Sequence, residues 1–145
     1  EQYTFEKPNG MRPVFRMKKY KTDWRVSFMG LFEELKDLGV DVDGGLQRIN
    51  GNEKLYTRLL GTFVKAIKGQ AVSPDFDSND YEDVKEKAHA LKGTSGNLSI
   101  TPVYEAYTEI MNLLRAGRPD EAKQLIAKII PVQEQIVSCI EKYMQ

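Results

Sequence analysis

Apolar residues recur along most of the chain at spacings of three and four, the period of a helix with one buried face. Glycine, proline and capping residues divide this pattern into segments. We expect helices over residues 22–38, 53–68, 79–98, 101–116 and 119–143, and one short helix within the loop 40–51. No segment alternates with period two over a useful length, so we predict no sheet.

Several helix ends carry local signals. Asn52 is placed to cap the helix 53–68, and Ser78 and Asp80 are expected to begin the helix 79–98. Thr101 followed by Pro102 is typical of an N-cap with proline at the first helical position. A further proline, at position 131, lies inside the last segment and is expected to kink or split that helix.

Each segment also predicts an inner face. For the helix 53–68 we expect Leu55, Leu59, Phe63, Ala66 and Ile67 to face inward, widened by Leu60 and Val64. For 101–116 the inward set is Val103, Ala106, Tyr107, Ile110, Leu113 and Leu114. For 119–143 it is Ala122, Leu125, Ile129, Val132, Ile136, Ile140 and Tyr143.

Short connections between helices favour antiparallel neighbours. The predicted fold class is all-α, an antiparallel up-down four-helix bundle over residues 40–145, with an additional N-terminal helix at 22–39 packed on it. Residues 1–21 have no clear period, contain two prolines and are locally basic, so we expect a linker or extended arm.

Composition excludes several classes of chemistry. The chain has 145 residues, with 21 Lys+Arg and 21 Asp+Glu, and the zero formal net charge argues against a dedicated nucleic-acid binder. The single cysteine, Cys139, excludes an internal disulfide, and the single histidine, His89, excludes a two-histidine metal site. We find no phosphate-binding glycine loop and no apolar run long enough for a membrane span. A cytoplasmic, reducing setting fits best.

The one histidine is predicted to point away from the core. On a helical wheel of residues 79–98 the apolar positions form one narrow stripe, and His89 lies about 140° from its centre. The stripe consists of Val84, Ala88, Leu91, Ser95 and Leu98. His89 is therefore expected to be exposed to solvent.

The neighbours of His89 at helical spacing suggest a chemistry. Lys85, Glu86, Lys92, Gly93 and Gly96 lie three, four or seven positions away and share its face. Two glycines inside a helix each cost about 1 kcal/mol relative to alanine, which the close approach of a partner surface would offset. An imidazole is a good nucleophile near pH 7, and lysine charges can stabilise a phosphoryl group, so the pattern indicates phosphoryl transfer. No ATP site is recognisable, so a partner must supply the donor.

Two stretches resemble a known family. Residues 89–94, HALKGT, resemble the H-x-L-K-G-[ST] signature of histidine-containing phosphotransfer (HPt) domains. Residues 45–56, GLQRINGNEKLY, resemble the segment that opens those domains. Together they extend the resemblance over residues 40–145.

The resemblance implies a monomeric four-helix bundle in a multistep His–Asp phosphorelay. His89 would accept a phosphoryl group from a receiver-domain aspartate of a response regulator and pass it to another receiver. Lys92 would stabilise the phosphoryl group, and Gly93 would permit receiver docking. Lys85 is added as a further cation from helix spacing alone, and Glu86 and Gly96 as partner-binding positions.

The same resemblance sets the expected partners and cofactors. The chain would need no cofactor and no metal of its own, and Mg²⁺ is expected on the partner receiver only. Partners would be receiver domains or a hybrid histidine kinase, with no nucleic acid and no membrane contact. Some family members orient the imidazole with a side-chain amide on the following helix, for which Asn112 is a weak candidate.

Other functions stay open from the sequence. The chain could be the phosphoacceptor domain of a larger histidine kinase, or a helical-bundle interaction module that is never phosphorylated. A bundle enzyme is disfavoured because inward-pointing Glu/His pairs are missing. Tyr104, Tyr107 and Met111 are expected to be core or rim packing, and Cys139 a packed helix residue.

Overall fold

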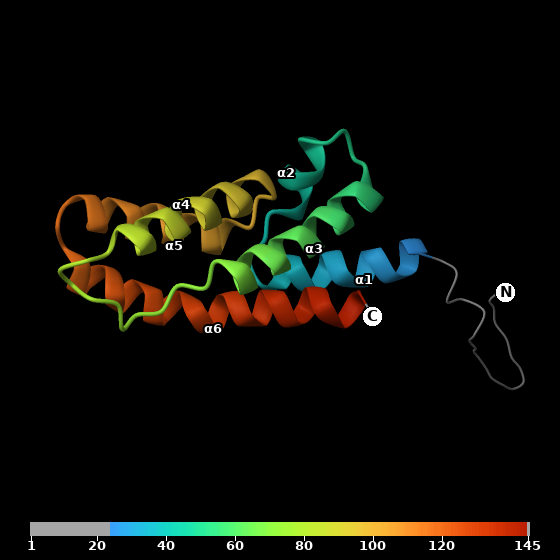
Figure 1. Cartoon of the computed structure of the whole chain (residues 1–145). Coiled ribbons are helices and arrows are strands. Elements are labelled where there is room, and N and C mark those ends of the chain that lie inside the picture. The colour runs from blue at the N-terminus through green and yellow to red at the C-terminus, as the bar shows by residue number, and fades with distance from the viewer. Residues whose placement is uncertain (1–23, 145) are drawn as a thin grey trace, which may run out of the picture. The chain divides into compact units, whose positions relative to one another are not determined.

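The computed structural model describes residues 24–144, with side chains from residue 28 onward, and this part contains six helices and no strand (Figure 1). The helices are α1 (Trp24–Asp37), α2 (Val42–Gln47), α3 (Glu53–Gly69), α4 (Glu82–Asn97), α5 (Thr101–Arg115) and α6 (Pro119–Tyr143). All the predicted helical segments are thus present, including the short helix in the loop 40–51. The expected linker 1–21 lies outside the described residues.

The chain divides into two compact units, residues 1–30 and 31–145, and their boundary falls within α1. In the second unit α3 and α5 each pack against both α4 and α6, so these four helices enclose one core (Figure 1). The domain boundaries predicted at 21 and 39 stay predictions. No helix within residues 24–144 has the length and apolar character of a membrane span.

The second half of α1 packs on this core. Leu31 and Leu35 are fully buried, each with 0% exposure. Between them in sequence, the carboxylate of Glu34 accepts hydrogen bonds from Lys142, at 2.7 Å, and from the hydroxyl of Tyr143 at the end of α6. The Lys142 bond is the main reason that the pKa of Glu34 lies below its ordinary value. The predicted packing of an N-terminal helix on the bundle is therefore correct for residues 31–37.

The predicted inner face of α5 is confirmed, because all six expected residues are buried. On α3 and α6 the prediction is partly wrong. The expected inward residues Leu55, Leu59, Ala66, Leu125, Val132 and Tyr143 are only half-buried, whereas Tyr56, Ile126 and Gln133 are buried in the core.

Paired polar groups explain much of this error. The hydroxyl of Tyr56 donates to the carbonyl of Leu98 at 2.7 Å, and that of Tyr107 donates to the amide oxygen of Gln133 at 2.8 Å. Burial raises the pKa of Tyr107 to about 12 and raises that of Tyr56 as well, so both tyrosines stay protonated donors. A polar side chain with its partner inside can occupy a core position that a hydrophobicity pattern assigns to a leucine.

Two predicted helix starts change in the structure. Helix α4 begins at Glu82 rather than near residue 79, because Ser78 instead bonds Asp120 at 3.1 Å and Lys123 at 2.7 Å, which ties this loop to α6. Ile100 rather than Thr101 is the N-cap of α5, so Pro102 is its second residue, where an N–H has no helical partner either.

The remaining end signals have mixed outcomes. Helix α6 runs without interruption through Pro131, so the predicted split does not occur. The Asn52 cap is confirmed, since its side chain accepts from the backbone N–H of Leu55 at 3.0 Å.

Helix α2 and the start of α3 hold the turn between α4 and α5. The N–H of Asp41 donates to the carbonyl of Ser99 at 2.9 Å, and the Arg48 guanidinium donates to the carbonyl of Gly96 at 2.5 Å. Gly45 makes the closest approach, because a Cβ there would lie 2.6 Å from the Tyr56 ring and 2.8 Å from the carbonyl oxygen of Leu98. This contact fixes where α4 ends.

The contact at Gly45 predicts a stability effect. Gly45→Ala should lower the free energy of unfolding by about 1–3 kcal/mol, because the new methyl group must displace the Tyr56 ring or the turn backbone. Gly61→Ala is the matched control, since no atom lies within 4 Å of a Cβ there. The control should raise stability by up to about 1 kcal/mol through helix propensity. Urea unfolding followed by circular dichroism measures both, and an unchanged Gly45→Ala midpoint would contradict the packing described.

Candidate functional site

The rotation of α4 is set by its buried stripe. Val84, Ala88, Leu91 and Ser95 are buried on the helix, and Leu98 is buried directly after it. The hydroxyl of Ser95 donates to the carbonyl of Leu91 at 2.6 Å, which satisfies it inside the core. Because this stripe faces inward, His89 is exposed, as the helical wheel predicts.

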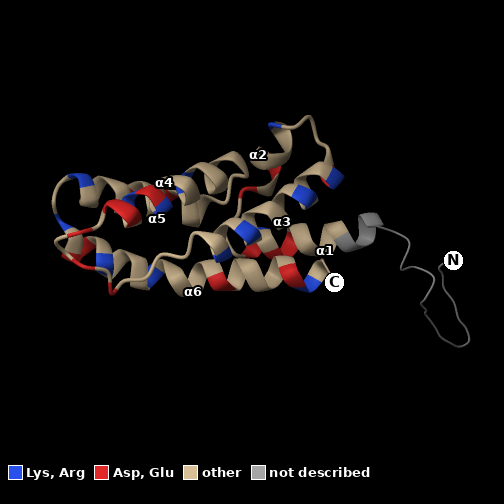
Figure 2. Ribbon diagram, in the orientation of Figure 1, with Lys and Arg blue, Asp and Glu red and all other residues tan. Residues whose placement is uncertain are grey.

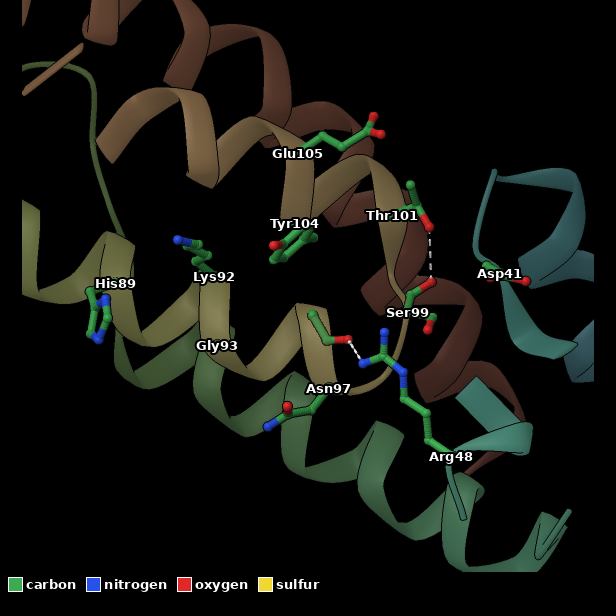
Figure 3. A pocket seen from close by; sticks show the side chains of 11 residues that line it. Asp41, Arg48, His89, Lys92, Gly93, Asn97, Ser99, Thr101, Tyr104 and Glu105 are labelled. Carbon is green, nitrogen blue, oxygen red and sulfur yellow. Dashed lines mark hydrogen bonds between the residues drawn. The ribbon is translucent and has the colours of Figure 1, made fainter. Parts of the chain in front are cut away.

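His89 and Lys92 both have unpaired side chains. Within residues 24–144 neither side chain makes a hydrogen bond or an ion pair. Figure 3 shows the imidazole and the ammonium group leaving α4 on different sides. The exposed imidazole is therefore open to attack an incoming electrophile, and the lysine charge is available one turn away.

A groove runs along α4 from His89 toward the turn into α5 (Figure 3). Its volume is about 500 Å³. It is lined by Asp41, Arg48, His89, Lys92, Gly93, Gly96, Asn97, Ser99, Thr101, Tyr104 and Glu105. The sequence-predicted residues His89, Lys92, Gly93 and Gly96 thus lie along one hollow.

The two glycines of this groove have different surroundings. A Cβ on Gly93 would meet no atom within 4 Å, so its missing side chain leaves open space next to His89. A Cβ on Gly96 would lie 2.8 Å from the ring of Tyr104. The lack of a side chain at Gly96 is therefore explained by the packing of Tyr104. The lack of a side chain at Gly93 is not explained by any contact among the described residues.

Lys85 and Glu86 do not line the groove. Lys85 forms an ion pair with Glu82 at 2.9 Å, and it lines a separate cavity near the start of α4. Glu86 is exposed, one turn before His89. Asn112 on α5 donates to Glu109 at 3.5 Å, and the structure gives it no bond to His89.

The other lysine in the first half of α4 is paired as well. Lys87 binds Asp83 at 3.2 Å. Of the three lysines on α4, Lys92 alone has no carboxylate partner among the described residues, and no charged residue follows it on this helix (Figure 2). An unpaired cation and an exposed nucleophile one turn apart are groups that can accept and stabilise a phosphoryl group.

Sequence reasoning missed some residues of the groove. Arg48 reaches it from the loop after α2 through a bond to Gly96 over a separation of 48 residues, which no local pattern predicts. Tyr104 was expected to pack in the core or at its rim. Its ring does cover Gly96, but the residue is 39% exposed and lines the groove. Cys139 is buried on α6, as expected.

Comparison with known proteins gives the class of this fold and site. The family model of the Hpt domain matches residues 55–144, which is more than half of the chain. The chain therefore belongs to the Hpt domain family. Domains of this family are phosphocarriers that interact with receiver domains of response regulators, and membership implies histidine phosphotransfer in phosphorelay signalling. Searches of the curated proteins and of the solved structures found no significant match.

Within residues 24–144 no group of three or more His, Cys, Asp or Glu side chains is arranged to hold a metal ion. The groove instead carries isolated charges of both signs, and Figure 3 shows Asp41 at its far end from His89.

The exposure of His89 predicts that the residue is not needed for folding. His89→Gln should change the free energy of unfolding by less than about 0.5 kcal/mol, because the imidazole is exposed and bonded to nothing. Leu91→Ala, two residues along the same helix, should cost about 2–5 kcal/mol, because Leu91 is fully buried at 0% exposure. Urea unfolding of both variants measures the contrast. Equal destabilisation would place His89 in the core and refute the rotation of α4.

Proposed function

We propose that His89 is the phosphorylated residue of this Hpt domain, and that it carries a phosphoryl group between receiver domains of response regulators. The observation that carries the proposal is the free imidazole of His89 beside the open surface over Gly93. The family match supplies the class of reaction and the class of partner. The antiparallel up-down arrangement of α3–α6 that we propose presents this face along the side of the bundle.

The transfer needs no cofactor on this chain, because each bond that forms is matched by a bond that breaks. A lone pair of an imidazole nitrogen of His89 attacks the phosphorus of the receiver's aspartyl phosphate. A P–N bond forms, the P–O bond to the aspartyl oxygen breaks, and the receiver is left with a free carboxylate. In the second transfer a carboxylate of another receiver attacks the same phosphorus, and the P–N bond breaks. Any Mg²⁺ needed to balance the phosphoryl charge belongs to the receiver in this scheme.

Lys92 is proposed to stabilise the phosphoryl group. Its ammonium group is unpaired, and its long flexible stem allows it to reach a group attached one turn away. Lys85 is the weaker candidate because Glu82 already neutralises it. Gly93 is proposed to admit the receiver, because any side chain there would project into the space next to the nucleophile.

Two alternatives are weighed against this proposal. In a larger histidine kinase, an attached ATP-binding domain would phosphorylate the same histidine. In a pure interaction module, no phosphate would be carried, but a solvent-exposed histidine and an unpaired lysine would then have no function in the groove. The single cysteine supports a reducing, cytoplasmic setting, in which the bundle acts as a monomer.

The proposal predicts a specific covalent label. Incubation with a phosphorylated receiver domain should label the chain with a phosphate that is labile in acid and stable in base, as expected for a P–N bond. ATP and magnesium alone should not label it, because no ATP site is recognisable. His89→Gln should abolish the label while the protein stays folded. Label that persists in the glutamine variant would assign the phosphate to another residue, and failure of every cognate receiver would refute the carrier function.

A second prediction separates the two lysines. Lys92→Ala should slow the transfer to His89 by about tenfold or more. Loss of a charge that stabilises the transferred group typically raises the activation free energy by a few kcal/mol. Lys92→Arg should retain more activity than the alanine variant, because it keeps the charge. Lys85→Ala is the matched control on the same helix and should transfer at the wild-type rate. Rapid-quench transfer assays measure all three, and equal rates would show that Lys92 is only a surface residue.

A further inference from the structure

Tyr104 is the one large apolar side chain exposed in the groove. Three large hydrophobic side chains are exposed within residues 28–144, namely Met29 at 62%, Tyr104 at 39% and Met144 at 40%. Of these three, only Tyr104 lines the groove that contains His89. Its hydroxyl has no hydrogen-bond partner among the described residues. An exposed aromatic ring with an unpaired hydroxyl is typical of a residue that a partner covers.

The ring of Tyr104 contacts the backbone of α4 at Gly96, and this contact is called its seat below. A Cβ at Gly96 would lie 2.8 and 2.9 Å from two ring carbons of Tyr104, so the ring lies directly on the helix backbone. Arg48 donates to the carbonyl of the same glycine at 2.5 Å. Gly96 thus allows one edge of the Tyr104 ring to approach the helix backbone, and a methyl group at position 96 would displace the ring.

The distance from His89 to this ring suits a receiver-sized contact. His89, Gly93 and Gly96 follow one another at four and three positions on the same face, and seven residues of helix rise about 10 Å. Transient signalling contacts bury less than about 1,200 Å² in total, so each partner contributes a patch of about 600 Å². A round patch of that area centred on His89 has a radius of about 14 Å and would include the ring of Tyr104.

We infer that Tyr104, seated on Gly96, is an apolar anchor of the receiver docking surface, and that it determines affinity for the receiver rather than the chemistry at His89. This inference rests on the proposed function, because the receiver is the partner that must cover His89 during transfer. The surface between the two residues, over Gly93, is open, so a partner surface can lie continuously from the imidazole to the ring. The part of Tyr104 assigned to the contact is the ring, because it is the large apolar surface that the groove exposes.

Two phosphoryl donors separate docking from chemistry. A phosphorylated receiver domain must dock before transfer, whereas phosphoramidate is small enough to reach His89 without using the Tyr104 surface. In the reaction with phosphoramidate the imidazole attacks phosphorus, the P–N bond of the donor breaks, and ammonia leaves. Labelling of His89 by phosphoramidate therefore reports the nucleophile alone.

Tyr104→Ala should raise the KM for the phosphorylated receiver at least about tenfold, as expected for loss of an aromatic interface anchor, with a smaller change in kcat. Tyr104→Phe should retain the wild-type KM, because the ring is kept. Met144→Ala is the matched control, since Met144 at 40% has almost the same exposure as Tyr104 at 39% but lies outside the groove. The control should transfer at the wild-type rate. Labelling by phosphoramidate should be the same in all of these proteins.

The seat on Gly96 is tested by a double-mutant cycle. Gly96→Ala should raise the KM for the receiver when Tyr104 is present, because the methyl group lifts the ring. The same substitution made in the Tyr104→Ala protein should have no further effect, because no ring is left to move. Circular dichroism before each assay shows that every variant is folded. If the two substitutions have additive effects on the KM, Gly96 does not position the Tyr104 ring, even if each substitution alone impairs transfer.

The remaining outcomes are distinguishable. An unchanged KM in Tyr104→Ala would overturn the docking role, while receiver-dependent labelling of His89 would still uphold the proposed function. If Tyr104→Ala slowed labelling equally with phosphoramidate and with the receiver, the docking role would also be overturned, because Tyr104 would then act on the nucleophile. If wild-type protein is labelled by neither donor, the proposed function itself fails.

Discussion

Burial of one narrow stripe on α4 is the constraint on which the site depends. The buried residues of the helix lie on one line from Val84 to Ser95, and Leu98 continues this line directly after the helix. A line this narrow can face the core in only one rotation, because any other rotation would bury a charged residue or expose Leu91. His89 and Gly93 are thereby exposed to solvent, although neither has a side-chain contact within the described residues that would orient it. The close contact of Gly45 with Tyr56, and the bond from Arg48 to the carbonyl of Gly96, then hold the end of the helix in place.

Much of this arrangement follows from the sequence, since apolar residues recur at helical spacing in the predicted segments. The exposure of His89 could be predicted because the stripe on α4 is narrow and unambiguous. The inner faces of α3 and α6 could not be predicted fully, because Tyr56 and Gln133 are buried through bonds to residues of other elements, Leu98 directly after α4 and Tyr107 on α5. Hydrophobicity along one segment carries no information about a hydrogen-bond partner supplied by another.

The same limit applies to the site. His89, Lys92 and Gly93 share one helix, so their spacing alone brings them together. Arg48 and Tyr104 reach the groove from other elements, and their positions depend on how α2 and α5 pack. Spacing also made Lys85 a candidate, because a helical wheel gives the direction of a side chain and not its partner. In the structure Lys85 forms an ion pair with Glu82, three residues earlier, which the wheel does not indicate.

The weakness of α4 as an isolated helix has a consequence for how the protein works. Gly93 and Gly96 each reduce helix propensity by about 1 kcal/mol, and a segment of 16 residues is at the length where isolated helices are marginal in water. The helix therefore exists because its neighbours hold it, and its backbone amides should exchange with solvent only when the surrounding core opens. The nucleophile has its geometry only while the whole bundle is intact, so an unfolded or half-folded chain presents the same histidine without the surface that a partner recognises.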